Sequence, residues 1–135
     1  IEVLNPEGFL MHHPVYEAAI VGAGISGCGA AGVLADSKHR VLVLEKSRGV
    51  GGRMATRRWE GGIFDSGAQF LTARTQEFRD QLASCSSLRE IPSFPERRIH
   101  EEGMSRVARF FFEKSPGVDL KLSNRVTSIQ VGDSG

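Results

Sequence analysis

The sequence predicts an α/β fold built on a mostly parallel sheet, and three neighbouring segments carry that prediction. Residues 16–21 (YEAAIV) and 41–44 (VLVL) are apolar runs with little alternation, which is typical of strands buried on both faces of a parallel sheet. Residues 25–35 lie between them and are rich in small side chains, which suits a helix that packs closely on strands. Together they predict a strand–helix–strand unit.

The rest of the chain predicts further elements by the same reasoning. Thr75 is a suitable N-cap, and Glu77 then lies near the positive end of the helix dipole. Residues 54–59 are expected to be extended and to end in a turn at residues 60–62. Periodicity predicts four more elements, namely helices over residues 76–83 and 104–113 and strands over residues 118–122 and 125–131.

Residues 84–100 predict a loop rather than a regular element. The segment is polar and contains Pro92 and Pro95, which cannot donate backbone hydrogen bonds within a strand or helix. We therefore expect an irregular connection between the two predicted helices.

Composition argues for a globular domain and against several classes of partner. The net charge is +1 over 135 residues, so no strong field favours nucleic acid or a membrane surface. No apolar run is long enough for a membrane helix and no signal peptide is evident, so we expect a cytoplasmic protein. Cys28, Cys85 and the four histidines are scattered, so we predict no metal site.

Glycine is the clearest deviation in composition, with 16 residues among 135, against a usual frequency of about 7%. The first motif is Gly22-x-Gly24-x-x-Gly27, with Ile25 and Ser26 opening the predicted helix. The first glycine permits a tight turn, the second lets the backbone approach a pyrophosphate, and the third lets the helix pack on the sheet. The helix N-terminus then attracts the anion, so the motif predicts a dinucleotide site.

Glu45 is the second candidate, because it ends the second predicted strand 18 residues after Gly27. An acidic residue about 20 residues after the glycine motif binds the hydroxyl groups of the adenosine ribose. Lys46 follows directly and is expected either at the surface or near the adenosine.

The third motif is the glycine doublet Gly51-Gly52 followed by Arg53 and Met54. It offers close backbone approach together with a guanidinium group for a phosphate. A simple NAD-dependent dehydrogenase does not need this motif, so the motif disfavours that class.

These motifs in this order resemble the flavin-containing amine oxidase superfamily, which includes monoamine and polyamine oxidases, phytoene desaturases and protoporphyrinogen oxidases. Residues 51–54 (GGRM), 64–74 (FDSGAQFLTAR) and 103–105 (GMS) are similar to renalase-like proteins, especially the bacterial ones. Phe70 departs from the pattern, because that family often has tyrosine there. The resemblance implies a three-layer Rossmann-like FAD/NAD(P)-binding domain.

The resemblance also implies the cofactor and its contacts. It implies FAD, held over residues 14–135 as the N-terminal part of an FAD-binding domain, after an irregular extension at residues 1–13. The substrate domain and the C-terminal flavin-binding segment are expected to be largely absent, so the domain would be incomplete. The implied cofactor-binding residues are Gly22, Gly24, Ile25, Ser26, Gly27, Glu45, Lys46, Gly52, Arg53, Met54, Gly67, Ala68, Gln69, Phe70 and Val126.

The reaction implied by a renalase-like protein is hydride transfer from a dihydronicotinamide, an aberrant NAD(P)H isomer, to FAD. Oxygen would then reoxidise the flavin and yield H₂O₂. No catalytic acid or base can be named from the sequence. Two alternatives stay open: a flavin amine oxidase or desaturase-type enzyme, and a non-catalytic dinucleotide-binding module.

Overall fold

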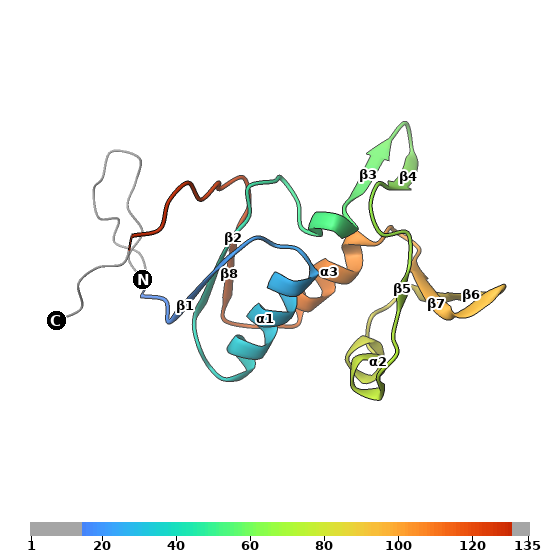
Figure 1. The fold of residues 1–135 in the computed structure, drawn as a ribbon, viewed down its shortest axis with the longest axis horizontal. Helices are drawn as coiled ribbons and strands as arrows, with labels where there is room; N and C mark the ends of the chain where they lie inside the picture. The colour runs from blue at the N-terminus through green and yellow to red at the C-terminus, as the bar shows by residue number, and fades with distance from the viewer. Residues whose placement is uncertain (1–14, 131–135) are drawn as a thin grey trace.

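A three-stranded parallel sheet forms the centre of the computed structural model, which describes residues 15–130 (Figure 1). Its strands are β1 (Ala18–Val21), β2 (Val41–Leu44) and β8 (Val118–Lys121), in the order β1-β2-β8. Helix α1 (Ile25–Asp36) connects β1 to β2, as the sequence predicts. All pairings in this sheet are parallel, which confirms the predicted fold class.

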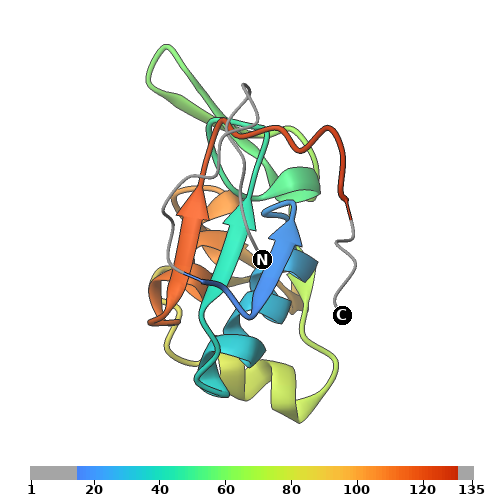
Figure 2. The ribbon, with the colours of Figure 1, turned by 90° about the vertical axis from the view of Figure 1, so that its left-hand side faces the viewer.

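Helices α1 and α3 (Ser105–Glu113) lie on the same face of this sheet, behind the strands in Figure 2. The core between them is fully buried and contains Cys28, Ala31, Val41, Val43, Met104, Val107 and Ala108. The opposite face carries no helix from residues 15–130, so this part of the chain shows two of the three expected layers.

The small residues of α1 have a direct packing reason. A Cβ atom at Gly27 would overlap the carbonyl oxygen of Gly22, and one at Gly32 would lie 3.2 Å from the Ser115 hydroxyl oxygen. The helix can therefore pack on the glycine turn only with glycine at position 27, and glycine at position 32 eases its approach to the segment after α3, which offsets the low helix propensity of glycine.

A two-stranded hairpin projects from the molecule beyond the end of α3 (Figure 1). Strand β3 (Thr56–Trp59) pairs antiparallel with β4 (Gly62–Asp65), and the short helix η1 (Gly52–Met54) precedes it. The two turn residues, Glu60 and Gly61, both have positive φ, at 46° and 78°. Such turns match the right-handed twist of hairpin strands, so the predicted turn is confirmed.

The loop predicted over residues 84–100 is wrong. Strands β6 (Leu88–Ile91) and β7 (Phe94–His100) form an antiparallel pair, and β5 (Leu71–Thr72) joins the other edge of β7. Helix α2 (Gln76–Leu82) stands between β5 and β6 in the chain.

The prolines misled the sequence interpretation because neither one interrupts the regular pairing. Pro92 lies in the turn between the strands, and Pro95 lies where the register shifts, between the pairs Ile91↔Phe94 and Glu90↔Arg98. A bulge leaves residues outside the ladder, so a missing N–H group there breaks no strand hydrogen bond.

The remaining boundaries test the other predictions. Thr75 caps α2 as predicted, because its Oγ1 accepts a hydrogen bond of 3.2 Å from the Phe78 N–H group. Residues 125–130 form no strand, against the prediction, and Ile129 is 77% exposed. Alternation of apolar residues alone does not produce a strand there, because no strand among the described residues is available to pair with it. Residue 131 and the predicted extension at residues 1–13 lie outside them.

Met104 tests the packing of α3. It is fully buried, so Met104→Ala should lower the free energy of unfolding by about 2–5 kcal/mol through lost burial and a residual cavity. Chemical denaturation of both proteins measures the change. Val33 is 65% exposed on α1, so the control Val33→Ala should change the same quantity by less than about 0.5 kcal/mol. Equal effects of the two substitutions would contradict the buried position of Met104.

Candidate functional site

The glycine turn joins β1 to α1 and leaves the helix N-terminus open. Gly22 has φ +103°, and its N–H group donates to the Leu44 carbonyl of β2 at 2.8 Å. Gly24 occupies the N-cap position, where no side chain bonds the first N–H groups of the helix. Ile25 and Ser26 follow in the first turn. An uncapped helix start with close backbone access is suited to bind a phosphate anion.

Glu45 fixes the end of β2 to this turn. One carboxylate oxygen accepts from the Ala23 N–H group at 2.7 Å and the other from the Ser47 N–H group at 2.7 Å. Burial alone raises the pKa of Glu45, but these two hydrogen bonds outweigh burial and hold the pKa below its ordinary value. The carboxylate is therefore ionised at neutral pH, and it has a structural role that the sequence interpretation missed.

The segment after β8 lies beside Glu45. The Asn124 N–H group donates to the Glu45 carbonyl at 2.9 Å, and Ser123 donates to the Ser47 carbonyl at 2.9 Å. Val126 follows two residues later and is half-buried. The structure thus brings a segment some 80 residues away in sequence to the end of β2.

The glycine doublet packs directly on the glycine turn. The Gly51 N–H group donates to the Ala23 carbonyl at 2.8 Å, and Gly51 and Gly24 form an isolated parallel bridge. Gly52 has φ +54°, and a Cβ atom there would lie 3.2 Å from the Gly24 Cα atom. Two backbones therefore meet where side chains have no room.

The segment after β4 lies against the backbone of Arg53. The Ala68 N–H group donates to the Arg53 carbonyl at 2.8 Å, and the Ser66 N–H group donates to the Ala55 carbonyl at 3.2 Å. A Cβ atom at Gly67 would overlap the Arg53 carbonyl oxygen. This explains why the sequence has glycine at position 67.

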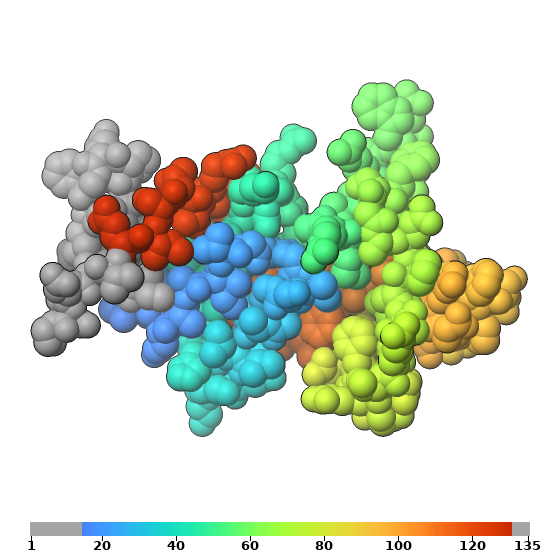
Figure 3. All heavy atoms as spheres, viewed as in Figure 1, coloured from blue at the N-terminus to red at the C-terminus, as the bar shows by residue number. Residues whose placement is uncertain are grey.

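These segments border a shallow, open hollow of about 680 Å³, lined by Ile25, Gly52, Arg53, Met54, Ser66, Gly67 and Ala68. The space-filling view shows the surface notched beside the projecting β3–β4 hairpin (Figure 3). Met54 is buried, whereas Arg53 is exposed. The Arg53 guanidinium group forms no hydrogen bond or ion pair within residues 15–130, so its donors are available to a ligand.

A polar cluster that sequence reasoning missed connects the hairpin to α3. The Asp65 carboxylate accepts from the Thr56 hydroxyl at 2.6 Å and from the Met104 N–H group at 2.8 Å, and the Thr56 oxygen accepts from the Ser105 N–H group at 2.9 Å. A Cβ atom at Gly103 would overlap the Thr56 side chain. Side chains of β3 and β4 therefore cap α3, a long-range capping arrangement that no local sequence pattern indicates.

Nine of the fifteen predicted site residues lie outside the lining of the hollow, among them Lys46, Gln69 and Phe70. Lys46 and Gln69 are exposed, and their side chains form no hydrogen bond within the described part of the chain. Phe70 is 38% exposed, and its ring faces the guanidinium group of Arg97. The structure thus brings six of the predicted residues together at the hollow, namely Ile25, Gly52, Arg53, Met54, Gly67 and Ala68.

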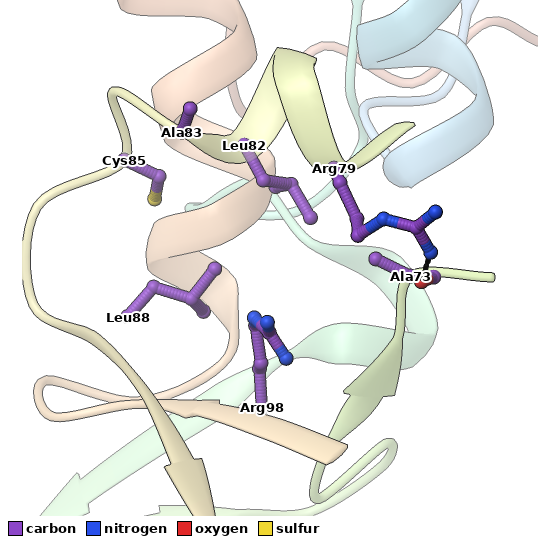
Figure 4. Close-up of a pocket in the computed structure, with 7 residues that line it drawn as sticks. All are labelled: Ala73, Arg79, Leu82, Ala83, Cys85, Leu88 and Arg98. Carbon is purple, nitrogen blue, oxygen red and sulfur yellow. Dashed lines mark hydrogen bonds between the residues drawn. The ribbon is translucent and has the colours of Figure 1, made fainter. Parts of the chain in front are cut away.

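A smaller hollow of about 230 Å³ lies between α2 and the β5–β7–β6 sheet (Figure 4). None of the predicted site residues line it. Its two arginines are already used internally, since Arg79 donates to the carbonyls of Ala73 and Arg74 at 3.0 and 2.9 Å, and Arg98 donates to Glu90 at 2.9 Å. It is therefore the weaker candidate for a ligand site.

Residues 15–130 contain neither a metal-binding cluster nor a membrane-spanning helix. That part of the chain holds no group of three or more His, Cys, Asp or Glu side chains arranged to bind a metal ion. It also contains no helix whose length and apolar character would let it cross a membrane.

Comparisons with known proteins agree with this geometry. Residues 20–84 match the family model of an NAD(P)-binding Rossmann-like domain. A 4,4'-diapophytoene desaturase of Staphylococcus aureus is 34% identical over 67 residues, which cover 50% of this chain and 13% of the desaturase. Putrescine oxidase bound to putrescine has 32% identity and a TM-score of 0.48, covering 55% of this chain and 16% of the oxidase.

A solved structure with wider coverage supports the fold alone. Pseudomonas aeruginosa PqsL in complex with 2-aminobenzoylacetate has a TM-score of 0.56 at 19% identity, covering 87% of this chain and 36% of PqsL. The chain therefore spans a small part of the length of its relatives. Residues 20–84 are thus similar to NAD(P)-binding Rossmann-like domains, and 67 residues of the chain are similar in sequence to a diapophytoene desaturase.

Gly67 tests the close approach to Arg53. Gly67→Ala places a Cβ atom on the Arg53 carbonyl oxygen, so it should push the two segments apart and lower the melting temperature by several degrees. Gly49→Ala is the matched control, because a Cβ atom there meets nothing within 4 Å. Calorimetry of both variants makes the comparison, and an unchanged melting temperature for Gly67→Ala would refute the contact.

Glu45 tests the anchoring of the glycine turn. At pH 7, Glu45→Gln should lower the free energy of unfolding by about 1–3 kcal/mol, because an amide cannot accept from both N–H groups. The folded pKa of Glu45 is depressed, so the wild-type advantage is fully present above the unfolded value of about 4.3. It is lost as the pH falls through the folded pKa.

Denaturation curves of wild type and Glu45→Gln between pH 7 and pH 3 measure this change. The gap between the two proteins should close at the acidic end. Glu60→Gln, at an exposed turn position, serves as the control for a lost surface charge. A gap that stays constant with pH would disprove the role of the ionised carboxylate.

Proposed function

We propose that this chain binds FAD in the hollow beside the glycine turn. The observation that carries the proposal is the convergence of three glycine-rich segments on one hollow, with the unpaired guanidinium group of Arg53 at its edge. A Cβ atom at Gly27 would overlap the Gly22 carbonyl, and one at Gly67 would overlap the Arg53 carbonyl, so glycine at both positions lets these segments pack together beside the hollow.

The proposed contacts follow the course of the dinucleotide. The N-terminus of α1, at Gly24, Ile25 and Ser26, would bind the pyrophosphate with help from Arg53. Glu45 would accept hydrogen bonds from the adenosine ribose with the lone pairs that Ala23 and Ser47 leave free. The remaining contacts would come from Gly22, Gly27, Lys46, Gly52, Met54, Gly67, Ala68, Gln69, Phe70 and Val126.

FAD would supply hydride acceptance, which no side chain in this site offers. The residues of this chain would hold the cofactor, orient it against the backbone of residues 66–68, and balance the charge of its phosphates. Residues 14–135 would form the N-terminal part of the FAD-binding domain of a longer protein. We further propose a cytoplasmic location, because the cysteines, Cys28 and Cys85, are both unpaired and buried.

For the whole protein we propose oxidation of a dihydronicotinamide, an aberrant NAD(P)H isomer, with O₂ as the electron acceptor. The support is the resemblance of GGRM, FDSGAQFLTAR and GMS to renalase-like proteins, and the structure gives GMS a structural role in the cap of α3. The second candidate is an amine oxidase or desaturase, which the sequence similarity to a desaturase and to putrescine oxidase favours.

The first test is the visible absorption spectrum of the purified chain with added FAD. Flavin bands should stay with the protein through a desalting column. Arg53→Ala should weaken FAD binding about 10- to 100-fold, through loss of a charge-assisted phosphate contact. Arg57→Ala on β3 removes the same charge from an exposed strand position and should leave FAD binding unchanged.

The same sample separates the candidate functions. Anaerobic bleaching of the flavin by 6-dihydro-NAD, without bleaching by putrescine, supports the dihydronicotinamide reaction, and the reverse pattern supports an amine oxidase. Retained flavin that neither compound reduces supports a non-catalytic module. Loss of all flavin from a chain that is folded by circular dichroism overturns the proposed cofactor site in this chain.

A further inference from the structure

Arg97 contacts two aromatic rings, and one of them belongs to the segment proposed to contact the flavin. The guanidinium carbon of Arg97 lies 4.4 Å from the ring centroid of Phe70 and 4.3 Å from that of Phe94. Phe70 follows Gln69 at the end of the GAQF segment, whereas Phe94 begins β7. Contacts among the three side chains thus connect β7 to residues 69–70, which follow the segment that lines the hollow.

This geometry fixes the cation while leaving its hydrogen-bond donors available. The two cation–π contacts restrain the guanidinium group, whereas its N–H groups lie in the guanidinium plane and are not used by these contacts. Nε of Arg97 lies 3.4 Å from the Glu96 carboxylate, and the terminal nitrogens form no hydrogen bond within residues 15–130. The Arg97 side chain is 35% exposed, so a ligand can reach it.

Two other arginines of the β5–β7–β6 sheet differ from Arg97, because each forms a short ion pair with a glutamate of another segment. Arg98 is paired with Glu90 at 2.9 Å, and Arg89 is paired with Glu101 at 2.9 Å, in ion pairs between β6 and either β7 or the turn that follows it. Arg97 extends from the opposite face of β7 to Arg98, because successive strand side chains alternate. Among residues 15–130, its only charged partner is the adjacent Glu96, which is 56% exposed, and solvent weakens such a pair.

We infer that Arg97, in cation–π contact with Phe70 and Phe94, recognises an oxyanion of the substrate, a phosphate or carboxylate group. A preorganised guanidinium edge binds such groups through two parallel hydrogen bonds. The inference rests on the proposed flavin site and defines the substrate class: an anionic substrate, such as a nicotinamide nucleotide, rather than a cationic amine or a neutral polyene.

The test uses the full chain loaded with FAD and stopped-flow reduction by 6-dihydro-NAD. Arg97→Met should raise the half-saturating concentration about tenfold or more and flatten its dependence on salt. The limiting reduction rate and FAD affinity should stay within about twofold, because Arg97 is not expected to touch the reacting atoms or the cofactor. Arg97→Lys should restore part of the affinity, since it keeps the charge but loses the planar stack. Arg89→Met is the matched control and should change none of these values.

A second measurement does not depend on flavin reduction. Calorimetric titration with nicotinamide mononucleotide, which has one phosphate and no adenosine, should show binding to wild type and Arg89→Met but loss of binding to Arg97→Met. Absence of binding to wild type, or equal binding to wild type and Arg97→Met, overturns the assignment of Arg97. Failure of the proposed cofactor site has a different signature, namely loss of flavin on desalting while the mononucleotide still binds through Arg97.

Discussion

The site depends on backbone packed against backbone. Gly24 meets Gly51 and Gly52, and Gly67 meets the carbonyl of Arg53; the separations exclude a Cβ atom at Gly67 and crowd one at Gly51 and Gly52. Such contacts are possible only where glycine removes the side chain, and they bring main-chain N–H groups and carbonyls close together. The hollow, the exposed Arg53 and the open start of α1 all take their positions from these contacts.

Two buried or half-buried carboxylates stabilise this arrangement from opposite sides. Glu45 bonds the N–H groups of Ala23 and Ser47 and so holds the glycine turn to β2. Asp65 bonds Thr56 and the N–H group of Met104, and so holds the β3–β4 hairpin to α3. Each carboxylate accepts a hydrogen bond from a backbone N–H group that is distant in the chain. These hydrogen bonds connect the glycine segments to the hydrophobic core beneath them.

The two antiparallel sheets extend the molecule away from this core. Phe94 of the β5–β7–β6 sheet and Phe70, which precedes β5, both contact the guanidinium group of Arg97. The proposed dinucleotide contacts of the glycine turn and Glu45 belong instead to the parallel sheet and the start of α1. The β5–β7–β6 sheet carries Arg97, the group proposed to distinguish one substrate from another. In many folds a rigid sheet positions the binding residues, and the segments attached to it determine specificity.

The sequence by itself determined the strand–helix–strand unit, the glycine turn and the cap at Thr75, because each depends on local periodicity or on the steric freedom of glycine. The resemblance of the motifs, rather than any local pattern, predicted that Gly52, Arg53, Gly67 and Ala68 belong to one site. Only the tertiary structure decided the β6–β7 pair, the absence of a strand over residues 125–130, the cap of α3 by Asp65 and the cation–π contacts of Arg97. The contacts involved reach partners up to 49 residues away in the chain. Pairing between distant segments follows from packing of the whole chain, which no window of neighbouring residues contains.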